Sequence, residues 1–182
     1  MIEKINLLSN PASQKEAVFV AFTTTRTIWE NYNETTEEGR QFEVPLVLMV
    51  QRWDGCKGFI GGNVDEGETL LTALSRELKE EANFVLSEDE FLSLIPVCSH
   101  KTENKVTHLF TVEISYVRMK ELIANSVKAE HFMSEIVGLL AIPFVNYPHQ
   151  KSFDNFIKDQ FAATVKEEVK ELIEMKKWPL SV

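Results

Sequence analysis

Apolar and β-branched residues are concentrated in several short runs, and polar segments separate these runs. The runs at 16–24, 44–52, 91–98, 105–114 and 135–144, with a shorter one at 59–60, predict β-strands. Residues 44–52 are almost continuously apolar, which is typical of a strand that is covered on both faces. The polar segment 29–40 predicts a loop, and the polar residues 100–104 predict a turn between two strands.

Three other segments repeat their apolar residues at three- and four-residue steps, which predicts helices. The first helix begins after Thr69, a plausible N-cap, and carries an apolar stripe of leucines. A second helix is expected over 117–126, and a long final helix from Phe153 to about Met175. The alternation of strands with few helices predicts an α/β fold, in which helices sandwich a mixed sheet.

Composition narrows the class of protein. With 182 residues, 44% of them hydrophobic, the chain can bury a core, and we expect one domain over 1–182. Two cysteines, and no signal peptide at the start of this sequence, favour a cytoplasmic location. The net charge of -9 suits a protein that binds a divalent metal together with a small phosphate ester. We expect neither DNA nor a membrane as a partner.

An acidic cluster lies on the first helix. Glu77 and Glu81 are four residues apart and share a face, and Glu80 flanks them. Arg76 precedes Glu77, and Glu68 lies in the loop before the helix. One interpretation is a solvated acidic face. The other is a set of oxygen ligands for Mg2+ or Mn2+, because a divalent cation turns the repulsion between carboxylates into ligation.

The surrounding frame favours the second interpretation. Residues 62–84, GNVDEGETLLTALSRELKEEANF, resemble the Nudix box Gly-x5-Glu-x7-Arg-Glu-U-x-Glu-Glu-x-Gly-U, in which U is bulky and apolar. Asn83 replaces the last glycine, and asparagine is well able to adopt the positive φ needed there. Ile60 stands where the family often has proline before the two glycines. The resemblance implies an α/β/α sandwich and metal-dependent hydrolysis of phosphoanhydrides.

Four stretches point to one branch of this family: VLMVQRWDGCKGFIGGNVD, SHK at 99–101, EIVGLLAIPF and NFIKDQFAATVKEEVKELI. With these stretches, residues 43–175 resemble the branch that removes caps from small nucleolar RNA and hydrolyses inosine diphosphates. The resemblance implies the metal-ligand set Gly61, Glu77, Glu80, Glu81, His100 and Glu171. Glu80 is expected to be either a ligand or the base that activates water. Arg76 is expected to hold Glu77 and Glu68 by ion pairing rather than to contact the substrate.

The same resemblance implies substrate contacts at Arg52, Phe59, Gly62 and Glu168. For Arg52 the alternative is an exposed strand end, and for Phe59 it is packing in the core. For Glu168, and likewise for Glu171, the alternative is a solvated helix face shared with neighbouring lysines. The branch carries an amide at the Glu168 position and a histidine on its first strand, where this chain is apolar around Phe19. Inosine preference therefore does not follow.

These observations predict a hydrolase of nucleoside diphosphates, or of nucleoside diphosphate-X compounds, that uses water activated by Mg2+ or Mn2+. Hydrolysis of RNA caps is an alternative, which the lack of a basic tract disfavours. A catalytically silent nucleotide-binding Nudix module is a second alternative, although all box glutamates are present. Family analogy suggests a homodimer.

Overall fold

The computed structural model describes residues 2–10, 14–30, 40–146 and 152–180. Its centre is a sheet in the order β1-β6-β7-β2-β3-β4, in which β5 also pairs with β2 and β8 with β3. The strands are β1 (Glu3–Ile5), β2 (Lys15–Glu30), β3 (Arg40–Arg52), β4 (Lys57–Gly58), β5 (Ile60–Asn63), β6 (Ile95–Lys101), β7 (Lys105–Glu113) and β8 (Ile136–Pro143). β2 and β7 are parallel, whereas the other pairs are antiparallel, so the predicted mixed sheet is confirmed.

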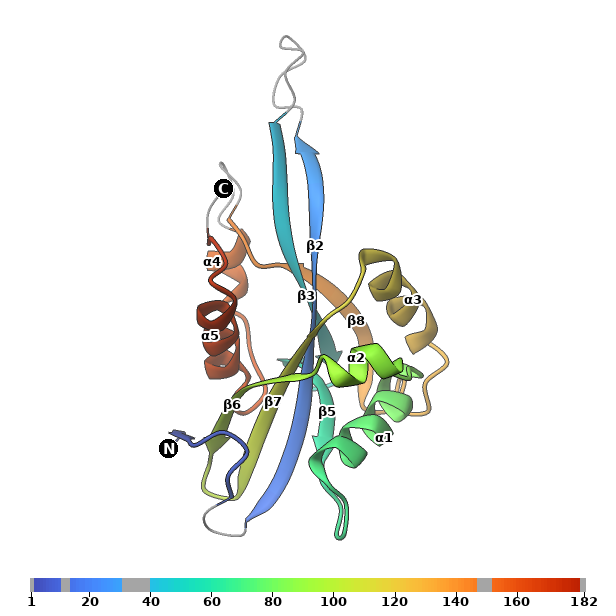
Figure 1. The fold of residues 1–182 in the computed structure, drawn as a ribbon, viewed down its shortest axis with the longest axis vertical. Helices are drawn as coiled ribbons and strands as arrows, with labels where there is room; N and C mark the ends of the chain where they lie inside the picture. The colour runs from blue at the N-terminus through green and yellow to red at the C-terminus, as the bar shows by residue number, and fades with distance from the viewer. Residues whose placement is uncertain (1, 11–13, 31–39, 147–151, 181–182) are drawn as a thin grey trace.

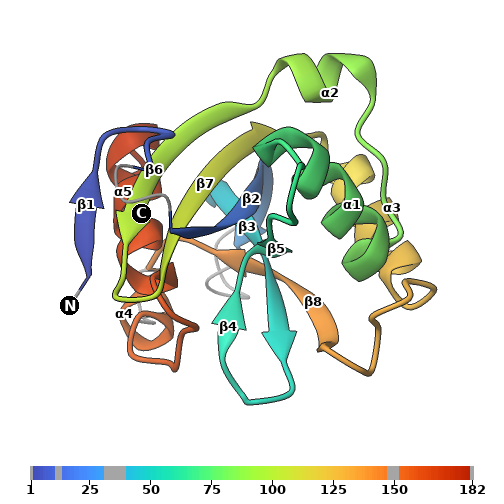
Figure 2. The same ribbon diagram turned by 90° about the horizontal axis from the view of Figure 1, so that it is seen from below.

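Helices cover both faces of this sheet (Figures 1 and 2). They are α1 (Leu70–Ala82), α2 (Glu88–Leu92), α3 (Tyr116–Ser126), α4 (Ser152–Phe156) and α5 (Val165–Lys176). Apolar residues of α1 and α3 pack in one core cluster, and those of α4 and α5 pack in another. The α/β/α sandwich predicted from the sequence is therefore confirmed.

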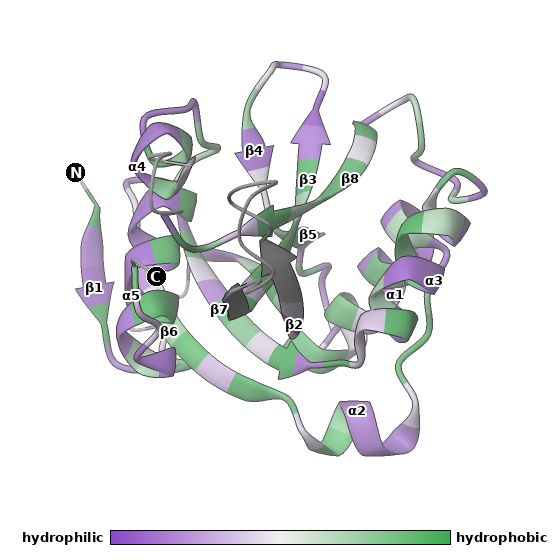
Figure 3. Cartoon of the chain, turned by 90° about the horizontal axis from the view of Figure 1, so that it is seen from above, coloured by the Kyte–Doolittle hydropathy of each residue, from purple (hydrophilic) through white to green (hydrophobic). Residues whose placement is uncertain are grey.

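The position of β3 between two cores explains why its sequence is almost continuously apolar. Leu48 and Val50 belong to the core under α1 and α3, while Val47 and Met49 belong to the core under α4 and α5. Successive side chains point to opposite faces, so a strand with a core on each side needs apolar residues at every position. The edge strands β1 and β4 are hydrophilic by contrast (Figure 3).

The predicted loop over 29–40 is wrong at both of its ends. β2 continues to Glu30 and β3 starts at Arg40, and these two residues pair directly. The two strands form an antiparallel ribbon that extends away from the body of the sheet (Figure 1). Backbone hydrogen bonds between strands do not depend on side-chain polarity, so a polar sequence can continue a ladder. Residues 31–39 lie outside the described residues.

The strand predicted over 91–98 also begins in the wrong place, because residues 88–92 form α2. Ser87 caps this helix: its hydroxyl accepts from the Glu90 N–H at 3.2 Å, and Glu90 accepts from the Ser87 N–H at 2.7 Å. This reciprocal capping box stabilises a short turn of helix ahead of an apolar stretch. β6 starts at Ile95 and continues to Lys101, so it includes the first two residues of the predicted turn.

The long final helix is wrong as well, because it is divided into α4 and α5. Between them, the chain forms two backbone hydrogen bonds with Lys57, which donates to Gln160 O at 2.9 Å and accepts from Ala162 N at 3.0 Å. Ala163 then takes a φ of 38°, in the left-handed region, before α5 begins. A tertiary contact with β4 thus interrupts a helical repeat of apolar residues. Within the described ranges, no helix combines the length and the apolar character needed to cross a bilayer.

Candidate active site

α1 begins and ends as its sequence predicts. Thr69 accepts from the Thr72 N–H at 3.2 Å, and Asn83 ends the helix at a φ of 47°. Leu74 and Leu78 are buried in the core, which fixes the rotation of the helix about its axis. That rotation turns Glu77 and Glu81, only 8% and 5% exposed, toward the sheet rather than toward solvent. The interpretation as a solvated acidic face is therefore wrong for these two side chains.

Arg76 joins three of the box carboxylates. Its Nη1 donates to Glu77 at 2.9 Å and to Glu80 at 3.0 Å. Its Nε and Nη2 each donate to a different oxygen of Glu68 at 3.1 Å. Nη2 also donates to the Asn63 carbonyl at 2.9 Å. The guanidinium thus binds carboxylates from the helix and from the loop before it, because a planar fork can bind several oxygens at fixed angles.

The Gly61-Gly62 pair allows β5 to approach α1 closely. The Gly61 N–H donates to Glu81 Oε2 at 2.9 Å, and the φ of this glycine is 138°. A Cβ on Gly61 would collide with the Val18 backbone, and one on Gly62 would collide with the Glu77 carboxylate. Gly61 therefore requires glycine, and a side chain at Gly62 would displace the Glu77 carboxylate.

Burial raises the pKa of two of these carboxyl groups, those of Glu77 and Glu81. Desolvation raises the pKa of Glu81 to about 8, and the nearby Glu77 adds to the shift while the Gly61 N–H opposes it. Desolvation also raises the pKa of Glu77, against the opposing effect of Arg76. Glu68 differs, since its hydrogen bonds with Arg76 hold its pKa below the ordinary value. A cation close to Glu77 or Glu81 would oppose these shifts, because an opposite charge favours the charged form of a carboxyl group.

The carboxylate oxygens at this site are of the chemical type that binds a divalent cation. Glu77 and Glu81 supply buried hard oxygen ligands, and the Gly61 backbone lies against Glu81. In the described part of the chain, however, no three His, Cys, Asp or Glu side chains form a group close enough to hold a metal. Arg76 draws Glu77 and Glu80 toward itself, whereas the Gly61 N–H holds Glu81. Binding of a cation would therefore require the carboxylates to reorient.

His100 and Glu171 lie close to each other. His100 is on β6, and its charged neighbours include Glu171 of α5, which pairs with Lys4. Burial lowers the pKa of His100, and its Nδ1 has no partner among the described residues. Over those same residues, neither His100 nor Glu171 makes a hydrogen bond or an ion pair with a box glutamate. Their role as metal ligands stays a prediction.

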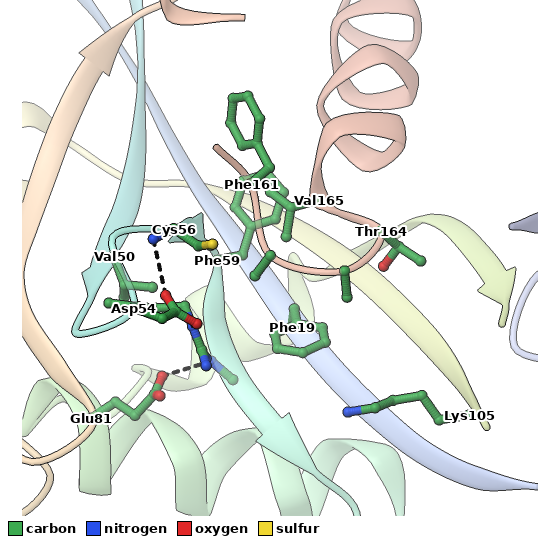
Figure 4. Close-up of a pocket in the computed structure, with 15 residues that line it drawn as sticks. Phe19, Val50, Asp54, Cys56, Phe59, Glu81, Lys105, Phe161, Thr164 and Val165 are labelled. Atoms are coloured by element: carbon green, nitrogen blue, oxygen red, sulfur yellow. Dashed lines mark hydrogen bonds and ion pairs between the residues drawn. The ribbon is translucent and has the colours of Figure 1, made fainter. Parts of the chain in front are cut away.

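A pocket of about 310 Å3 lies beside the box (Figure 4). Four of the predicted site residues line it: Arg52, Phe59, Gly61 and Glu81. Phe59 is only 2% exposed, so it belongs both to the pocket wall and to the core. Arg52 is exposed and pairs with Asp54 at 3.2 Å. The pocket thus brings the end of the acidic helix together with the residues expected to contact substrate. Gly62 is not among its lining residues and lies instead against Glu77.

Glu168 supports the wall of this pocket from behind. It is 0% exposed, so the solvated face considered for it is wrong. Its Oε1 accepts from the Thr164 hydroxyl at 2.7 Å and from the Thr107 hydroxyl at 3.0 Å, and Thr164 lines the pocket. Desolvation raises the pKa of Glu168 to about 7, although these hydrogen bonds oppose the shift.

Several pocket residues were not identified from the sequence as site residues. They include Lys105, at the start of β7, and Phe161 to Val165, in the segment where the predicted long helix is interrupted. Phe19 of β2 also lines the pocket, on the strand where the similar branch carries a histidine. No local pattern marks these positions, because they meet only through the pairing of β2 with β7 and the contact between Lys57 and the segment before α5.

Comparisons with known proteins agree with this geometry. The sequence is 34% identical over 99 residues to the U8 snoRNA-decapping enzyme of Homalodisca vitripennis, covering 53% of each chain. It is 30% identical over 126 residues to the Tudor-interacting repair regulator protein of Homo sapiens, covering 66% of this chain and 57% of that protein. The matched region spans about half the length of the U8 snoRNA-decapping enzymes of Homalodisca vitripennis and Xenopus laevis, 53% and 48% respectively.

The fold is similar to that of a mutT/nudix family protein from Listeria innocua. The TM-score is 0.58 at 14% identity, and the match covers 93% of this chain and 96% of that one. This likeness shows the Nudix fold. Residues 34–177 match the family described as Nudt16-like: U8 snoRNA-decapping enzyme-like. Because that match covers most of the chain, the protein belongs to the Nudt16-like family.

Proposed function

We propose that this protein hydrolyses a phosphoanhydride bond in nucleoside diphosphates or nucleoside diphosphate-X compounds, with Mg2+ or Mn2+ as cofactor. One observation carries the proposal: Glu81 lies on the same buried face of α1 as Glu77, and it also lines the pocket. A group bound in the pocket would therefore reach the carboxylates that suit a divalent ion. Membership of the Nudt16-like family supports the same reaction class.

The proposed division of roles follows from the contacts. Glu77 and Glu81, with the Gly61 carbonyl, would hold the ion. When bound, such an ion lowers the pKa of a water molecule and neutralises charge on the phosphate. Glu80 would be a further ligand or the base that accepts the proton of the attacking water. Arg76 would hold Glu77, Glu80 and Glu68 in place, since it already donates to all three.

The pocket would bind the nucleoside portion of the substrate. Phe59 would offer its ring to the base, and Arg52 would contact the sugar or a phosphate after release from Asp54. Glu168 would act on the base only through the wall residue Thr164, because its own side chain is fully buried. Gly62 would contribute by keeping β5 close to Glu77.

A substrate panel tests the proposal. The protein should be incubated with Mg2+ and then Mn2+ against purine and pyrimidine di- and triphosphates, ADP-ribose, nucleotide sugars, dinucleoside polyphosphates and capped RNA. Chromatography of the products identifies both the substrate and the bond that is cut. We expect turnover of at least one diphosphate, abolished in E81Q and retained in E88Q, which changes an exposed glutamate on α2. No turnover of any compound would overturn the hydrolase proposal and favour a binding module.

Cap hydrolysis is a second candidate, and the 34% identity to a U8 snoRNA-decapping enzyme favours it. The capped-RNA arm of the panel separates the two candidates. A higher kcat/KM for capped RNA than for every free nucleotide would favour cap removal, and the reverse order would favour small nucleotides. A single domain over 1–182, a homodimer and a cytoplasmic location stay predictions from the sequence.

A further inference from the structure

The basic side chains in and near the pocket differ in how many carboxylates they already bind. Arg52 pairs with Asp54, and Arg76 donates to three box glutamates. Lys105 also lines the pocket, yet it forms no ion pair with any residue that the structure describes. Its Nζ donates to the neutral Asn63 Oδ1 at 3.3 Å. The Lys105 ammonium therefore keeps most of its capacity to bind an anion.

The backbone fixes the place from which this side chain extends. Lys105 is the first residue of β7, where it pairs with Lys15 of β2. Thr102 accepts from the Lys105 N–H through its hydroxyl at 3.2 Å, and its own N–H donates to the Lys105 carbonyl at 2.9 Å. Figure 4 shows the side chain of Lys105 extending from β7 toward the side of the pocket where Glu81 lies.

Asn63 links Lys105 to the acidic cluster. Its side chain accepts from Lys105, and its carbonyl accepts from Arg76 Nη2 at 2.9 Å. Asn63 directly follows the Gly61-Gly62 pair at the end of β5. The position of the Lys105 ammonium is thus tied to the same backbone segment that holds Glu81 and abuts Glu77.

We propose that Lys105 is a phosphate-binding residue of this site and that Asn63 positions it. The inference rests on the proposed function and deepens it. A diphosphate entering a pocket bordered by glutamates needs positive charge beyond that of a divalent ion. A lysine ammonium supplies a point charge with three donors to the nonbridging oxygens. Lys105 would contact the phosphate without taking part in bond cleavage, so it governs binding more than the chemical step.

The test uses K105M, which keeps the apolar stem and removes the charge, K105R, which restores the charge, and K101M as a matched control. Lys101 pairs with Val106 on the neighbouring strand and does not line the pocket. The first measurement is calorimetric binding of a nonhydrolysable methylene-bridged nucleoside diphosphate with Mg2+. The second is KM and kcat on whichever diphosphate the wild-type protein hydrolyses.

Loss of one charge-assisted hydrogen bond predicts about tenfold to a hundredfold weaker binding by K105M and a comparable rise in KM. We expect kcat to change less, K105R to recover most of the affinity, K101M to stay within about twofold of the wild type, and N63A to give an intermediate loss. Thermal unfolding of each variant confirms that it is folded. N63A, which removes only the side chain that holds the Lys105 ammonium, keeps the test valid where K105M is unstable.

The two proposals fail in distinguishable ways. Turnover by the wild type with unchanged binding and KM in K105M overturns the role of Lys105 and leaves the hydrolase proposal standing. Binding of the analogue that weakens in K105M, without turnover of any substrate, supports Lys105 and overturns the hydrolase proposal. Failure of the wild-type protein to bind any diphosphate analogue overturns the role of Lys105 directly.

Discussion

The two acidic regions of this molecule lie against opposite faces of the sheet and differ in how they are organised. On α1, Arg76 gathers carboxylates that are close in the sequence, and Glu81 faces the pocket. Around α5, His100 and Glu171 approach from β6 and α5, and Lys4 of the edge strand pairs with Glu171. The first region has an arginine that binds three carboxylates and a glutamate that lines the pocket. The second has an ion pair between Glu171 and the exposed Lys4, so our proposal places the chemistry in the first.

The largest expected effect comes from comparing E81Q with E171Q. Loss of a ligand or general base should lower kcat in E81Q about a hundredfold or more, because positioned acid–base groups contribute that much. E171Q should retain activity within about threefold if the α5 region is separate from the chemistry. Steady-state kinetics at saturating Mg2+ measure both. A loss in E171Q as large as in E81Q would show that the two regions act as one site.

The second prediction concerns stability and pH. The folded-state pKa of Glu81 is about 8, above its ordinary value of 4.5, so the folded state binds more protons between these pH values. Unfolding free energy contributed by this group should therefore fall as the pH rises from about 5 to 8, in total by a few kcal/mol. E81Q should show a shallower decline. Urea denaturation of metal-free protein at several pH values measures this, and parallel curves for the two proteins would contradict the assignment.

The third prediction tests the contacts between Arg76 and the carboxylates that it binds. R76A leaves Glu68, Glu77 and Glu80 without their shared cation, which should destabilise the metal-free protein by about 1–3 kcal/mol. Added Mg2+ should recover part of that loss, because it replaces the missing positive charge. R118A removes the cation of another region, where Arg118 pairs with Glu90 at 3.0 Å, and its stability should not respond to Mg2+. Equal responses of the two variants would indicate nonspecific binding of the ion.

The smallest effect is expected for E168Q. Gln can still accept from the Thr164 and Thr107 hydroxyls, so activity should change less than about threefold. Because the pKa of Glu168 is raised to about 7, wild-type stability should fall between pH 5 and 7 relative to E168Q. Chemical denaturation at these two pH values checks the difference. A large loss of kcat in E168Q would give the α5 region a direct part in the reaction.

The sequence determined those helices and strands that depend on residues close together in the chain. Thr69 and Asn83 bound α1, because an N-cap hydroxyl and a residue tolerant of positive φ act within one turn of helix. The apolar run in β3 indicated a strand covered on both faces, because its side chains alternate between two cores. The spacing of Glu77 and Glu81 placed them on one helix face, although only the packing of Leu74 and Leu78 buried that face.

The tertiary structure decided the rest. Backbone hydrogen bonds with Lys57 divide the expected long helix, so the residues between α4 and α5 become part of the pocket wall. Lys105 reaches the pocket because β7 pairs with β2, a contact between residues that are about ninety positions apart in the chain. The periodicity of side chains along one helix or strand does not indicate which distant residues that element will contact. The sequence by itself thus determined the acidic helix and the reaction class that we propose for it. Only folding decided that Lys105 and the segment before α5 lie at the same pocket as Glu81, because these contacts join residues far apart in the chain.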